Sequence, residues 1–241
     1  MRAALSTRAR DAAFAVALAG TLAWYNNIAG RSRWHRRWYP AVNAGAAAMV
    51  VALAAAGGLT PDDLGLARDR FRAGLRLGGA AAAPVAAAYT AAAAVPALRA
   101  PLRDQRIAGL TTRQLAYEVL VRIPVGTVAW EEIAFRGALH AALCRVLPRR
   151  GAIAAGSVIF GLWHIRPAAE ALGANGLASG RAARPAAVTG VVAGTAAAGA
   201  LLAGLRDRSG SLAAPVTLHL AANCLGALAA ALSTRPEQPG E

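Results

Sequence analysis

Long apolar runs separated by short arginine-rich segments are the feature that most constrains this chain. The runs cover about residues 12–29, 41–59, 79–97, 124–144, 151–165, 187–205 and 212–232. Each reaches or approaches the roughly 20 helical residues that cross a ~30 Å hydrocarbon core. Only 16% of the 241 residues are charged and 56% are hydrophobic, more apolar than an ordinary soluble domain. The pattern predicts an all-α, polytopic transmembrane helix bundle with about seven to eight spans.

The charge distribution fits the same class of protein. The formal net charge is +14, and all 26 basic residues are arginines. They lie in segments that flank the apolar runs, which favours anionic membrane lipids as partners and argues against nucleic acid. His35, in the basic and aromatic segment 30–40, is expected to be an interfacial anchor. The bias toward arginine and alanine suggests a bacterium of high genomic GC, and hence an integral protein of the bacterial plasma membrane.

Glu131 and Glu132 are the only carboxylates deep within an apolar run. An ionisable group inside a membrane costs at least a few kcal/mol to bury and is a functional candidate by default. At about 100° per residue, Glu132 and Arg136 lie about 40° apart on a helix and can form a buried ion pair. Glu131 then points elsewhere, which predicts a free carboxylate suited to general-base chemistry.

Two further apolar runs carry interior polar groups. Phe160 and His164 are four residues apart in "FGLWH", and His219 and Asn223 are four apart in "HLAAN". Because lipid-facing placement is costly for such side chains, we expect three helices to direct them into one shared cavity. His164 falls near a membrane surface, so either its helix extends beyond Arg166 or a helix is broken there.

The residues allow two ways of activating water. In the first, His164 and His219 hold zinc, which turns a bound water into hydroxide. In the second, Glu131 and His164 deprotonate water, while His219 and Asn223 donate hydrogen bonds to an oxyanion. The absence of H-E-x-x-H and of a cysteine pair favours the second. No cofactor is therefore certain, and zinc applies only to the metal mechanism. The spans contain neither G-x-S-G nor an aspartate pair, which argues against intramembrane serine and aspartyl proteases.

The three motifs together resemble the CPBP family of intramembrane proteases, also called the ABI family, which includes the CAAX prenyl endopeptidases and bacteriocin-processing proteins. "EEIAFR" matches its E-E-x-x-x-R, "FGLWH" its F-x-x-x-H and "HLAAN" its H-x-x-x-N. The likeness covers about residues 110–228. It implies an endopeptidase with a site recessed in the membrane, and it implies that Glu131 is the base, that His164 shares the water, and that His219 and Asn223 stabilise the oxyanion.

The resemblance divides the chain into N-terminal spans with basic loops (1–109), a catalytic membrane core (110–228) and a polar tail (229–241). The expected partners are membrane lipids and a peptide or protein substrate, which in this family can be lipidated. Glu132, Arg136 and Phe160 are expected to support the site. The alternatives are a non-catalytic scaffold or bacteriocin-immunity protein of the same fold, which could dispense with any of the four catalytic residues, and a transporter, which would also bury charges near the midplane.

Overall fold

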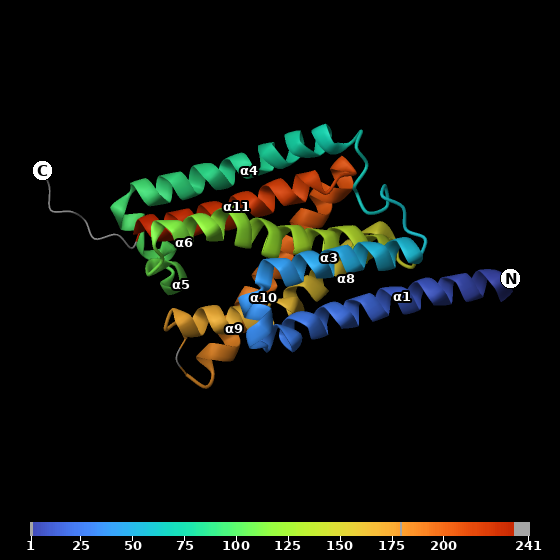
Figure 1. Cartoon of the computed structure of the whole chain (residues 1–241), viewed down its shortest axis with the longest axis horizontal. Helices are drawn as coiled ribbons and strands as arrows, with labels where there is room; N and C mark the ends of the chain where they lie inside the picture. The colour runs from blue at the N-terminus through green and yellow to red at the C-terminus, as the bar shows by residue number, and fades with distance from the viewer. Residues whose placement is uncertain (1, 179, 234–241) are drawn as a thin grey trace, which may run out of the picture.

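The computed structural model describes residues 2–178 and 180–233, and these residues form helices and connecting loops without strands. Figure 1 shows the long helices running roughly side by side. Residues 234–241 of the predicted polar tail lie outside the described residues. The helices are α1 (Arg2–Asn27), η1 (Ala29–Arg31), α2 (Arg33–Arg37), α3 (Tyr39–Ala56), α4 (Phe71–Ala94), η2 (Pro96–Leu98), η3 (Ala100–Leu102), α5 (Gln105–Ala108), α6 (Thr112–Tyr117), η4 (Glu118–Ala129), η5 (Glu132–Leu139), α7 (His140–Cys144), α8 (Arg149–Trp163), α9 (Ile165–Ala174), α10 (Ala183–Ser209) and α11 (Ala213–Ser233).

Four helices of the described chain, α3, α4, α10 and α11, are long and apolar enough to cross a membrane. The expected count of seven to eight spans is not confirmed. One physical reason is length, since α8 has only 15 residues, fewer than the roughly 20 that a straight span needs. Another is charge, because the helical stretch that contains η4 and η5 carries both buried glutamates and Arg136.

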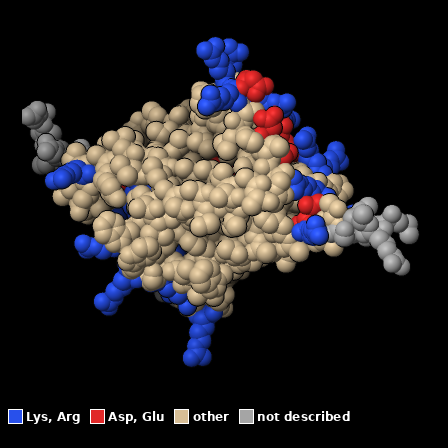
Figure 2. All heavy atoms as spheres, turned by 45° about the vertical axis from the view of Figure 1, so that its right-hand side comes forward, with Lys and Arg blue, Asp and Glu red and all other residues tan. Residues whose placement is uncertain are grey.

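The surface has the charge distribution of a protein that sits in a bilayer. In Figure 2, arginines and carboxylates gather at the borders of the visible face, and a broad band of other residues lies between them. Leu53, Leu120, Val158 and Leu201 are among the apolar side chains that remain exposed. Such a band is costly in water and favourable in lipid. The chain is an integral membrane protein.

The helix that carries the two glutamates departs from α-helical geometry. From Thr112 to Cys144 the chain is helical almost throughout, but η4 and η5 are π-helical, with the wider i→i+5 turn. Pro124 lies inside η4 and cannot donate a backbone hydrogen bond, which disturbs the α-helical ladder at that point. The α-helical turn of 100° per residue expected for this stretch was therefore wrong for η4 and η5.

Glycines set the closest contacts between helices. A Cβ on Gly78 of α4 would lie 2.6 Å from the carbonyl oxygen of Ala214 in α11, and one on Gly74 would lie 2.8 Å from Ser211 Cβ. Gly161 of α8 approaches α10 in the same way, since a Cβ there would lie 2.8 Å from Val192 O. Small residues thus allow the backbones of these helices to approach each other, as is common in membrane bundles.

The largest buried apolar cluster surrounds the start of η5. Trp130, Phe135, Phe160 and Trp163 are all nearly inaccessible and pack with their rings in contact. This cluster joins the helix of the two glutamates to α8. The cluster fixes the position of Glu131 relative to His164 at the end of α8.

Helix α8 ends at His164, which separates it from α9. Of the two alternatives for this region, the structure therefore contains the break. The Asn26 side-chain amide of α1 donates a 2.7 Å hydrogen bond to the Trp163 carbonyl, and the Arg166 Nε donates a 2.7 Å bond to the Asn26 carbonyl. The first bond satisfies a carbonyl at the end of α8, and the second satisfies a carbonyl at the end of α1.

Candidate active site

Glu131 and His164 face each other at this break. Glu131 is 5% exposed, and its Oε2 lies 3.9 Å from His164 Nε2. His164 Nδ1 lies 2.8 Å from the Phe160 carbonyl oxygen. Because a carbonyl can only accept, Nδ1 carries the proton and donates it, and a neutral His164 presents an Nε2 lone pair to Glu131. Glu131 Oε2 is buried and has no hydrogen-bond partner among the described residues, so two acceptors face each other.

Asn223 lines the same cavity as Glu131 and His164. The cavity has a volume of about 840 Å³, within the range of ligand-binding clefts. Its walls come from several helices that are distant in sequence, among them the η4–η5 helix, α9 and α11. Three of the four predicted catalytic residues thus share one cavity, with a carboxylate, an imidazole and an amide from three helical segments.

His219 is placed differently and is not among the residues that line this cavity. Its Nδ1 lies 2.7 Å from Glu132 Oε1. The same oxygen lies 3.1 Å from Arg136 Nη1, so the expected ion pair between Glu132 and Arg136 is present. A carboxylate paired with arginine can only accept, and His219 Nδ1–H is therefore the donor. The hydrogen bond from His219 to Glu132 was not predicted from the sequence.

Arg136 also stacks on Phe160, with its guanidinium carbon 4.0 Å from the ring centroid. A cation above an aromatic face is attracted to the ring quadrupole, most strongly where water is excluded. Glu132, Arg136, Phe160 and His219 therefore form one connected set behind the cavity. Arg136 Nη2 and Glu132 Oε2 are buried without a hydrogen-bond partner in the described part of the chain.

His140 lies outside this arrangement. Its Nε2 is 2.8 Å from Asp207 Oδ1 and 3.6 Å from Cys144 Sγ. The contact with Asp207 joins α7 to the end of α10, and the contact with Cys144 lies within α7. His140, Cys144 and Asp207 do not line the cavity.

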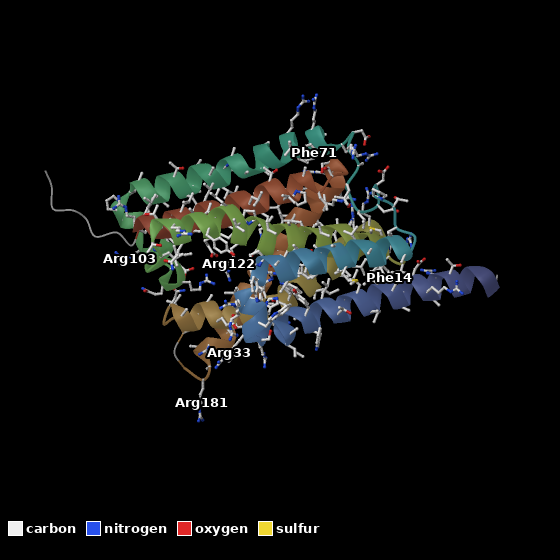
Figure 3. All side chains as sticks on the ribbon, in the orientation of Figure 1. Phe14, Arg33, Phe71, Arg103, Arg122 and Arg181 are labelled. Atoms are coloured by element: carbon white, nitrogen blue, oxygen red, sulfur yellow. The ribbon has the colours of Figure 1, made fainter. Side chains whose placement is uncertain are left out.

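Ion pairs line the cavity at the end of the bundle near α5 and α9, where Arg122 and Arg103 are labelled in Figure 3. Sequence analysis did not single out these residues, although the i, i+4 spacing of two of the pairs is a usable signal. Asp104 raises the pKa of the Arg106 guanidinium by accepting its hydrogen bonds. The pairs are Arg106–Asp104 at 2.6 Å, Arg122–Glu118 at 2.6 Å and Arg166–Glu170 at 2.8 Å.

Tyr39, at the start of α3, is a further cavity residue that sequence analysis missed. Its hydroxyl lies 3.2 Å from Thr127 Oγ1, and the Arg122 guanidinium lies 4.6 Å from its ring centroid. It falls in an aromatic interfacial segment, so nothing local to the sequence separates it from Trp34 or Trp38. Only the tertiary contact with η4 brings it to the cavity.

The sequence assigned His164 and His219 as metal ligands only for the zinc mechanism. The described residues contain no group of three or more His, Cys, Asp or Glu side chains placed to hold a metal ion. His219 directs Nδ1 to Glu132, while His164 directs Nε2 to Glu131. The donor set of the described residues therefore does not fit a zinc site.

These observations define a helical integral membrane protein with a buried carboxylate, an imidazole and an amide around one polar cavity. Residues 113–225 match the family model "Type II CAAX prenyl endopeptidase Rce1-like", a protease family within CPBP. This match confirms the resemblance to the CPBP family seen in the motifs. Searches of curated proteins and of solved structures return no match to this chain.

Proposed function

We propose that this protein is an intramembrane endopeptidase of the CAAX-protease type that uses a glutamate- and histidine-activated water. The observation that carries the proposal is the pair of facing acceptors, Glu131 Oε2 and His164 Nε2, at the wall of a polar cavity. A water molecule has two O–H donors and can donate one to each of them. Such a water is held in place and made more nucleophilic at the same time.

In the proposed reaction, the water oxygen attacks the carbonyl carbon of the scissile peptide bond as Glu131 takes up one of its protons. The carbonyl oxygen becomes an oxyanion, and the Asn223 amide donates a hydrogen bond to it. The tetrahedral intermediate breaks at the C–N bond, and the proton held by Glu131 passes to the leaving amine. A carboxylic acid and an amine are the products, and Glu131 returns to its ionised form.

His219 has a conditional part in this scheme. Its Nδ1–H donates to Glu132, so Nε2 of the neutral ring has no proton to donate. Only the imidazolium form could stabilise an oxyanion together with Asn223. Glu132 therefore acts in the proposal as a positioning residue for His219, held in turn by Arg136.

The substrate is a peptide or protein, with a lipidated peptide as the first candidate to test because the matched family is named for CAAX prenyl endopeptidases. We further propose that α1, the helix from 112 to 144 and α8 cross the bilayer beside the four apolar helices, which gives seven spans. The proposed location is the bacterial plasma membrane.

The test is cleavage of lipidated and unlipidated peptides by the purified protein in lipid. Glu131→Gln and His164→Ala should each lower the rate by about 10²–10⁴-fold, the usual contribution of general-base catalysis. Thermal denaturation in the same lipid shows whether each variant still folds. Full activity in either folded variant would overturn the mechanism, and absence of cleavage by wild type would favour the scaffold alternative.

Chelator separates the two water-activation mechanisms. We expect cleavage to continue after treatment with a zinc chelator, because the described side chains form no three-donor group. Chelator-sensitive activity that returns on addition of zinc would instead assign the reaction to a metalloprotease.

A further inference from the structure

A second pocket lies on another face of the helix that carries Glu131. It has a volume of about 390 Å³ and is lined by residues of three regions, the loop before α4, the η4–η5 helix and the beginning of α11. Ala129, Ile133, Leu212 and Val216 supply apolar walls. None of its lining residues lines the catalytic cavity. The pocket is therefore a separate site, and its small volume suits one hydrocarbon chain.

The loop that forms one wall is held in a fixed position. Leu212 N donates a 2.9 Å hydrogen bond to Gly65 O, and Arg206 Nη2 donates a 2.9 Å bond to Asp63 O. Gly65 has φ +75°, a left-handed conformation that glycine adopts readily. These contacts tie the loop to the ends of α10 and α11, so the protein's own hydrogen bonds define this wall of the pocket.

A cation lies at the rim of this apolar pocket. Arg68 lines it, and its side chain has no hydrogen bond or ion pair within the described part of the chain. Residues 68–76 contain four arginines and one aspartate. Phe71, labelled in Figure 3, stands at the start of α4 toward the end of the bundle that also carries the N-terminus. At this end of the bundle, the lipid headgroups are expected to border the hydrocarbon core.

We propose that this pocket binds one acyl chain of an anionic membrane phospholipid, with its phosphate against Arg68. The apolar walls accept the chain, and the rim arginine with its basic surroundings selects a negative headgroup. Ile133 directly follows Glu132 in the chain. The bound acyl chain packs against the helix of the two glutamates at residues that do not line the catalytic cavity.

The test uses phosphatidylglycerol with a photoactivatable group in its acyl chain, in phosphatidylcholine vesicles that contain the full-length protein. Crosslinks mapped by mass spectrometry should concentrate in peptides containing residues 129–133 and 212–216. Unlabelled phosphatidylglycerol should compete better than phosphatidylcholine. Crosslinks spread evenly over the lipid-facing helices would overturn the proposal, as would equal competition by the two lipids.

Two pairs of variants complete the experiment. Val216→Trp fills the pocket and should lower crosslinking about fivefold or more, whereas Leu228→Trp, on the exposed side of α11 away from the pocket, should not. Arg68→Gln should weaken phosphatidylglycerol competition about fivefold, the equivalent of about 1 kcal/mol per basic residue. Its control is Arg72→Gln, which is exposed and does not line the pocket.

Arg68→Gln changes a surface side chain, so it tests the site even if Val216→Trp fails to fold. Unchanged competition in Arg68→Gln would remove the assigned headgroup contact. Displacement of the probe by a lipidated peptide but not by phosphatidylglycerol would assign the pocket to substrate and overturn the proposal. Peptide cleavage is measured in a separate assay. If the protein cleaves no peptide but the crosslinks remain specific, the proposed protease function fails and the lipid site is still supported.

Discussion

At the scale of single residues, the Glu132 carboxylate lies between Arg136 and His219 with 0% exposure. Burying a carboxylate is tolerated only where cations and hydrogen-bond donors compensate for lost hydration. Glu132 thereby connects the η4–η5 helix to α11. Glu131, one residue earlier, has no such partner on Oε2 and faces His164. Adjacent residues of one type thus have different surroundings, which supports different roles for them.

Removing Arg136 should destabilise the protein strongly. Arg136→Ala leaves Glu132 as a buried charge with only His219 beside it and also removes the contact with Phe160. Breaking a buried pair in this way costs about 3–5 kcal/mol. Thermal denaturation in detergent should show a large fall in midpoint.

The matched control is Arg122→Ala, which breaks a partly exposed i, i+4 pair with Glu118. Such pairs contribute about 1 kcal/mol or less. Equal denaturation midpoints for the two variants would show that the Glu132–Arg136 pair contributes no more to stability than the Arg122–Glu118 pair.

His35 makes stability depend on pH. It is 4% exposed and lies 3.2 Å from Asn43 Oδ1, so the expectation of an interfacial anchor was wrong. Burial lowers the pKa of His35 below its ordinary value of 6.5. The unfolded chain then binds the proton more readily than the folded one, and stability falls as pH drops below about 6.5. His35→Gln should reduce this fall in denaturation midpoints measured between about pH 7.5 and 5, a range that includes the ordinary imidazole pKa. An unchanged pH profile would contradict the assignment.

At the scale of helices, the motifs predicted contacts better than they predicted geometry. Spacing of four residues was enough to foresee the Glu132–Arg136 pair, because that spacing joins neighbouring turns. It could not foresee the bond from His219 to Glu132, which spans 87 positions. Nor could it foresee the π-helical turns, since they depend on how the whole bundle holds the chain on either side of Pro124.

The contact between α4 and α11 provides a test at this scale. Gly78→Ala would place a Cβ 2.6 Å from the Ala214 carbonyl oxygen, so the helices must separate. A backbone atom cannot move aside as a side chain can, and we expect a loss of about 1–3 kcal/mol, as for other overpacked sites. The control is the next residue, since a Cβ at Gly79 meets nothing within 4 Å. Gly79→Ala should leave the denaturation midpoint unchanged or raise it, and an equal fall in both variants would refute the packing argument.

At the scale of the whole molecule, composition predicted a membrane protein, and the ordered motifs predicted the family whose model matches residues 113–225. The number of spans was harder to predict, because hydropathy treats each segment alone. Segments such as α8 are short, and the η4–η5 helix is charged, yet both pack within the bundle. A membrane helix that is covered by other helices need not be apolar enough to face lipid by itself.

The arrangement in Figure 1 makes the membrane placement testable. The loop 57–70 lies toward the end of the bundle that also carries the N-terminus, whereas Arg33 and Arg181 lie toward the end with α9 (Figure 3). With seven spans, these ends face opposite compartments. In a variant with Cys144 and Cys224 replaced by alanine, Asp62→Cys should react with an impermeant maleimide from one side of sealed vesicles. Arg33→Cys and Arg181→Cys should react only from the other side, because a charged reagent does not cross the hydrocarbon core. Labelling of all three cysteines from the same side would exclude this placement, since the two ends of the bundle would then share one compartment.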